Sequence, residues 1–150
     1  MNLQYLARIV LLALCAVQGG ATIVLDLNRT HAAHPQWLGH ARFHIVWQTA
    51  SVAILAVFEV LLLSHHGAYE SERFYLTSLL AGIPMLGFFA ALFTRRIYGG
   101  TLSDPGGIPA ARFTVRGRQL RIDLNLVAEL AGILTLAGTV WLFHWAGSQR

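Results

Sequence analysis

The sequence predicts an all-α membrane protein that forms one bundle of four transmembrane helices. Hydrophobic residues make up 55% of the 150 residues and charged residues only 12%, whereas soluble proteins average about 25% charged residues. Four apolar segments divide the chain, at about 5–25, 43–64, 74–95 and 122–145. Each is close to the roughly 20 residues that cross a bilayer. Backbone amides find no other partner inside lipid, so each segment is expected to be helical.

Residues 1–150 are expected to form a single membrane domain, because four such helices leave no room for a soluble one. All eleven basic residues are arginine, and six of them lie from the last residue of the third segment to the start of the fourth. Arginine-rich loops stay in the cytoplasm. The absence of lysine is typical of a GC-rich bacterial genome. We therefore expect a multi-pass protein of a bacterial inner membrane, with both termini in the periplasm.

The long connection before the fourth segment has two parts. Residues 98–110 are rich in glycine and proline and lack the lysine of a P-loop. Residues 112–121 alternate charged and apolar side chains, which favours a short interfacial strand or helix against lipid head groups. Membrane topology accounts for the arginines, so membrane lipid is an expected partner and nucleic acid is not.

Polar side chains repeat every three or four residues in three of the predicted helices, so each of these helices carries one polar stripe. The stripes contain Gln18, Thr22 and Asp26 in the first helix, His40, His44 and Gln48 in the second, and Asn125 and Glu129 in the fourth. Polar residues inside a membrane are costly and are candidates for function. All three stripes reach the cytoplasmic ends of their helices, so we expect them to meet in one polar pocket.

The chemistry favoured for this pocket is binding of a lipid-like or sterol-like small molecule and its isomerisation by proton transfer. Histidine titrates near neutrality, and a neighbouring carboxyl group can exchange protons with it. The candidate catalytic residues are His44, Glu129, His40 and Asp26. The candidate ligand-binding residues are Gln18, Thr22, Trp37, Arg42, Trp47, Gln48 and Asn125. This interpretation needs no cofactor.

Two other functions stay open. A metal ion could be the cofactor of a membrane enzyme, because histidines four residues apart on a helix are a common ligand spacing. Its ligands would be His31, His34, His40 and His44. The histidine cluster could instead stabilise a loop in a non-catalytic accessory subunit. Glu59 lies about 22 Å from His44 along the helix, so it is expected near the outer surface, paired with His144 or with His65 and His66.

Residues 30–44 resemble the signature T-H…P-x-W-x-x-H-A-[RK]-F-H of a little-characterised family of small four-helix membrane proteins. Thr30-His31, Pro35, Trp37 and the run from His40 to His44 match it. A more distant resemblance is to the emopamil-binding sterol isomerases and other EXPERA-domain proteins, whose pattern Pro35, Trp37, Trp47 and Gln48 match. The acidic residue of that pattern falls on His44 here. This second resemblance implies an intramembrane cavity for a flat apolar cation or a sterol-like ligand.

Overall fold

The computed structural model of the protein describes residues 2–103 and 107–149 and contains four long helices and a two-stranded hairpin. In chain order these are α1 (Leu3–Asp26), α2 (Gly39–Ser64), α3 (Glu70–Thr94), β1 (Ala111–Val115), β2 (Arg118–Ile122) and α4 (Leu124–Ser148). All four helices are long and apolar enough to cross a membrane. The four predicted helices are therefore confirmed, with bounds that differ from the predicted ones by a few residues.

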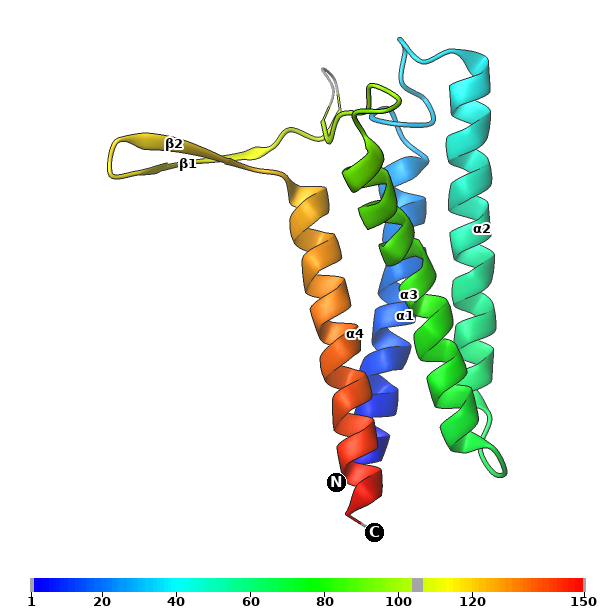
Figure 1. The fold of residues 1–150 in the computed structure, drawn as a ribbon. Coiled ribbons are helices and arrows are strands. Elements are labelled where there is room, and N and C mark those ends of the chain that lie inside the picture. Colours follow the sequence, from blue (N-terminus) through cyan, green and yellow to red (C-terminus); the bar gives the residue numbers. More distant parts are fainter. Residues whose placement is uncertain (1, 104–106, 150) are drawn as a thin grey trace.

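The helices run alternately in opposite directions and pack into one bundle (Figure 1). Helices α1 and α3 each pack against both α2 and α4. Both chain termini lie at one end of the bundle, which we call the terminal end, together with the short α2–α3 connection. The connections after α1 and after α3 lie at the opposite end, which we call the loop end. This arrangement agrees with the prediction that both termini lie on the same side of the membrane.

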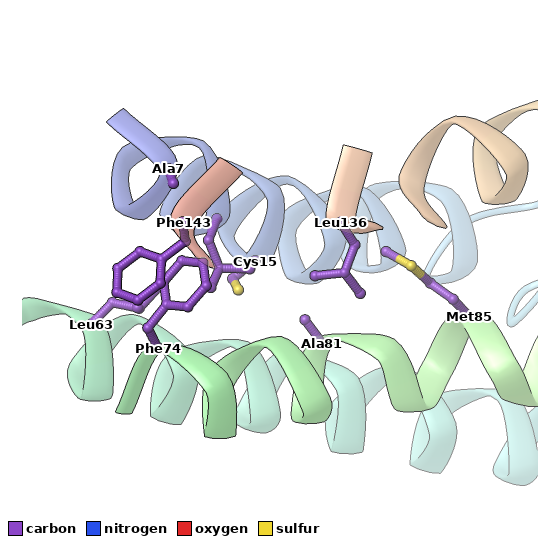
Figure 2. Close-up of a cluster of buried hydrophobic side chains, with 9 residues drawn as sticks. Ala7, Cys15, Leu63, Phe74, Ala81, Met85, Leu136 and Phe143 are labelled. Atoms are coloured by element: carbon purple, nitrogen blue, oxygen red, sulfur yellow. The ribbon is translucent and has the colours of Figure 1, made fainter. Parts of the chain in front are cut away.

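Apolar side chains pack most tightly in the half of the bundle nearer the terminal end. Leu11 and Cys15 of α1 are fully buried. Beside them the rings of Phe74 and Phe143 stack with centroids 3.8 Å apart (Figure 2). The buried residues of α4 begin only at Leu136. The first three turns of α4 are therefore less tightly enclosed, and the bundle is more open at the loop end.

Two polar contacts stabilise the terminal half. Arg8 is buried and donates hydrogen bonds to the carbonyl oxygens of Leu63 (2.7 Å) and His65 (3.2 Å). Glu59 is only 1% exposed, and its carboxyl group interacts with the thiol of Cys15. Glu59 lies near the end of α2 that is distant from His44, as expected, with its side chain facing into the bundle. Two of its expected partners contact other residues instead, since His144 contacts Tyr75 and His66 contacts Glu70.

The strands β1 and β2 form an antiparallel hairpin that projects sideways from the loop end, away from the helices (Figure 1). Its turn consists of Arg116 and Gly117, both with positive φ angles, 48° and 76°. Positive φ at both central residues is the geometry of a two-residue hairpin turn of type I′. The all-α prediction misses this element, although alternation over 112–121 correctly indicated that a short strand was one alternative.

Candidate functional site

A pocket of about 290 Å³ lies at the loop end of the bundle. Its walls come from the α1–α2 connection, the end of α3, the loop that follows α3 and the start of α4. The polar side chains that line it belong to Thr30, His31, His34, Arg95, Tyr98, Thr101, Ser103 and Asn125. Apolar lining comes mainly from Trp37, Phe88, Leu92, Leu102 and Ile108. No carboxylate occurs among the described lining residues, so the pocket offers hydrogen-bond donors and one guanidinium beside apolar surface.

A series of hydrogen bonds indicates which ring nitrogen of neutral His31 is protonated. The Asn28 side-chain nitrogen donates to the Val24 carbonyl oxygen (2.9 Å), which makes Asn28 Oδ1 an acceptor. The Thr30 hydroxyl donates its one proton to this Oδ1 (2.6 Å), so it accepts from Nδ1 of His31 (2.8 Å). Neutral His31 therefore carries its proton on Nδ1. Its Nε2 atom has a free lone pair and can accept a proton.

His34 carries its proton on the other nitrogen. The backbone N–H of Gln36 donates to Nδ1 of His34 (3.2 Å), so the proton of the neutral ring is on Nε2. His34 is only 4% exposed, which restricts rotation of the ring. The pocket thus contains one imidazole whose Nε2 can accept a proton and one whose Nε2–H can donate a hydrogen bond.

Trp37 and Arg42 hold the loop that carries the two histidines. The Trp37 ring lies 5.8 Å from the His31 ring and 5.9 Å from the His34 ring, measured between centroids. The Arg42 guanidinium donates to the His34 carbonyl oxygen (2.8 Å). Trp37 also lines the pocket, whereas Arg42 lies outside the lining and supports the loop from α2.

Asp26, the last residue of α1, connects this loop to the helices. Its backbone oxygen accepts from the N–H of Ala32 (2.9 Å), and its Oδ2 accepts from the Thr49 hydroxyl (3.3 Å). Its carboxylate also interacts electrostatically with His31. Asp26 therefore lies next to the pocket without lining it.

The polar stripe of α2 does not enter the pocket. Helix α2 faces the bundle with Thr49 and Ala56, among others. Gln48 precedes Thr49 by one residue, so its stripe is rotated about 100° from that face. His40, His44 and Gln48 are all exposed. The expectation that the stripes of all three helices share one chamber is therefore wrong for α2.

The four histidines of the alternative metal site form two separate pairs. His40 and His44 contact each other through their Nε2 atoms (3.0 Å), and the exposed Trp47 stacks on His44. His31 and His34 lie in the pocket instead. Within residues 2–103 and 107–149, no group of three or more histidine, cysteine, aspartate or glutamate side chains could hold a metal ion.

The other predicted site residues divide between the pocket and the bundle. Asn125 lines the pocket. Glu129 lies one turn further into α4 and is half-buried. Gln18 donates to the carbonyl oxygen of Ala81 (3.4 Å), and Thr22 donates to the Gln18 carbonyl oxygen (2.7 Å). Gln18 therefore connects α1 to α3, and Thr22 bonds within its own helix.

Arg95 and Tyr98 are among the pocket residues that the sequence did not predict. The sequence interpretation treated Arg95 only as a signal of topology. However, Phe88, Leu92 and Arg95 follow one another at spacings of four and three residues, and all three line the pocket. Tyr98 folds back so that its hydroxyl donates to the Ala91 carbonyl oxygen (2.8 Å). The spacing at the end of α3 was a signal that could have identified Arg95.

No protein-family model, curated protein or solved structure matches this chain. The two family resemblances carried by residues 30–48 therefore stay predictions. Function has to be argued from the chemistry of the pocket itself.

Proposed function

We propose that this chain is a multi-pass membrane protein that binds a lipid-like small molecule in the loop-end pocket and catalyses proton transfer on it. The observation that carries the proposal is the opposite placement of the ring protons on His31 and His34 within one pocket. A general base beside a fixed hydrogen-bond donor can move a proton and stabilise the charge that forms.

The lining supports an amphiphilic ligand. Arg95 and Asn125 offer donors to a polar head that carries hydrogen-bond acceptors, and the Tyr98 hydroxyl oxygen can accept a hydrogen bond. Phe88, Leu92 and other apolar side chains offer contact to a hydrocarbon body. The pocket lies at the ends of membrane-length helices, where a lipid-like molecule would have its own head group.

In the proposed reaction, Nε2 of His31 removes a proton from one atom of the bound molecule and returns it at a second atom. Nε2–H of His34 donates a hydrogen bond that stabilises the negative charge that forms on the molecule in between. The substrate loses one proton and gains one, so the reaction is an isomerisation without oxidation or reduction. Asp26 stabilises the His31 imidazolium that forms. His31 returns to its starting state when it gives the proton back, and exchange of its imidazolium proton with water before that step replaces a substrate hydrogen by a solvent hydrogen.

Arginine distribution supports a topology with the loop end in the cytoplasm and both termini in the periplasm of a bacterial inner membrane. Reporter fusions test this topology. A periplasm-specific phosphatase fused after Gln149 should be active, and one inserted between Arg116 and Gly117 should be inactive. The reverse pattern would contradict the proposed orientation.

Deuterium incorporation tests the chemistry without knowledge of the substrate. Membrane lipid extract is incubated in D2O with the protein, and lipid species that gain deuterium are identified by mass spectrometry. The wild type should label a lipid species, and His31→Gln or His34→Gln should lower its rate about 100-fold or more. His44→Gln is the matched control because His44 lies on the outer face of α2, and it should retain the activity. Equal loss in the control, or labelling by none of the proteins, would overturn the proposal.

A further inference from the structure

The β1–β2 hairpin has two chemically different faces. Antiparallel pairing sets Arg112 opposite Arg121 and Phe113 opposite Leu120. Side chains alternate between faces along a strand, so the arginine pair and the Phe113–Leu120 pair lie on opposite faces. The apolar face also contains Ala111, Val115 and Ile122, with Arg118 at its turn end. The second face contains Arg112, Thr114, Gln119 and Arg121.

The hairpin lacks the packing partners that such a short element needs. Phe113 is 52% exposed and Leu120 is 48% exposed. Each strand has five residues, and an isolated two-stranded hairpin is marginally stable at best in water. A surface outside the described part of the chain is therefore needed to cover the apolar face.

The opposite face of the hairpin concentrates positive charge. Arg112 and Arg121 are direct cross-strand neighbours, so their Cβ atoms lie about 5 Å apart, where like charges destabilise a sheet. Residues 111–122 contain four arginines and no acidic residue. Among the described residues, the two acid–base ion pairs both lie at the terminal end and involve no hairpin arginine. An external anion would remove the repulsion within the pair.

The position of the hairpin indicates which surface could both cover its apolar face and supply an anion to its arginine pair. It leaves the bundle at the loop end and runs crosswise to the helices (Figure 1). If the helices cross a membrane, the hairpin lies in the plane of the lipid head groups. Amphipathic elements in this plane bury their apolar face at the boundary of the acyl chains and leave arginines at the level of the phosphates.

We propose that the β1–β2 hairpin docks on a membrane surface containing anionic lipid, with Phe113 and Leu120 immersed and Arg112 and Arg121 bound to lipid phosphates. The proposal rests on the membrane insertion proposed above and adds a lipid-binding surface distinct from the pocket.

Spin-label accessibility in nanodiscs tests this arrangement on the full chain. Single cysteines are placed at Phe113, Thr114 or Leu120 in a Cys15→Ala background, in phosphatidylcholine with or without phosphatidylglycerol. With phosphatidylglycerol present, labels at 113 and 120 should be more accessible to oxygen than to a water-soluble nickel chelate. The label at 114 should show the reverse. A label at Ile54, which is exposed in the middle of α2, reports insertion of the bundle.

Charge removal tests the role of the arginine pair. The double variant Arg112→Gln/Arg121→Gln should weaken hairpin immersion about fivefold for each arginine in the presence of phosphatidylglycerol. The matched double variant Arg29→Gln/Arg96→Gln removes the same charge from exposed positions at the loop end, and it should leave immersion unchanged.

The outcomes separate the alternatives. Equal aqueous accessibility at 113, 114 and 120, with an immersed label at Ile54, would overturn the docking proposal while leaving membrane insertion intact. Equal effects of the two double variants would overturn the role of the arginine pair. Concentration-dependent immobilisation of the label at 113 in both lipid mixtures would indicate that the hairpin packs against a second copy of the chain and not against the bilayer, which would overturn the proposal. An aqueous label at Ile54 would instead contradict membrane insertion itself.

Discussion

Substitution of Arg8 by methionine should strongly destabilise the terminal half of the bundle. Methionine retains much of the apolar side-chain volume and removes the guanidinium, which donates to the carbonyl oxygens of Leu63 and His65. These carbonyls lie at the end of α2 and have no helical N–H partner. Hydrogen bonds to a charged group contribute about 1.5–3 kcal/mol each. The 3.2 Å bond to His65 is the weaker one, so the expected total is about 3–5 kcal/mol.

The ion pair between Arg8 and Glu70 (3.2 Å) is left out of this sum, because Glu70 is solvent-exposed and such pairs contribute little. The free energy of unfolding is measured by steric trapping in bicelles. Arg29→Met is the matched control, since Arg29 is exposed at the loop end, and it should change stability by less than about 0.5 kcal/mol. A loss of less than about 1 kcal/mol in Arg8→Met would refute the assigned role of the buried guanidinium.

Three further predictions concern packing and the pocket. A Cβ atom on Gly19 would lie 2.5 Å from the Cβ of Ala56, so Gly19→Ala should lower the melting temperature at a cost of about 1–3 kcal/mol. Nothing lies within 4 Å of such an atom on Gly20, so Gly20→Ala is the neutral control, and equal melting temperatures would contradict the packing. Thr30→Val removes the oxygen that accepts from Nδ1–H of His31. The tautomer ratio of neutral His31, measured by ¹⁵N NMR, should therefore shift about fivefold toward Nε2–H. An unchanged ratio would contradict the assigned hydrogen bonds. Cys15 is fully buried, so a maleimide should modify it only in unfolded protein, and rapid labelling of the folded protein would disprove this burial.

Much of the fold follows directly from the sequence, because the hydropathy of a membrane-length helix depends on composition over about 20 residues. The segment 74–95, for example, corresponds to α3 (Glu70–Thr94). The hairpin was harder to assign, because five alternating residues fit a strand or a short helix about equally well. Its two-residue turn depends on positive φ at Arg116, which is a residue type without a strong preference for that geometry.

The location of the site was predicted better than its residues. The sequence placed a polar pocket at the ends of the helices near residues 26–48 and 125, and a pocket does lie at this end of the bundle. Helical spacing showed that His40 and His44 share a face, but the direction of that face depends on packing of the whole helix. The proton positions of His31 and His34 depend on irregular loop geometry around Asn28, which no periodic pattern encodes.

The most direct test of the central claim is the tautomeric state of the two pocket histidines. Protein labelled with ¹⁵N in its histidine rings is reconstituted in bilayers, and the signals are assigned by their loss in His31→Gln and His34→Gln. At a pH where both rings are neutral, the account predicts a proton on Nδ1 of His31 and on Nε2 of His34. The same tautomer at both positions would contradict the assignment of His31 as general base and His34 as hydrogen-bond donor.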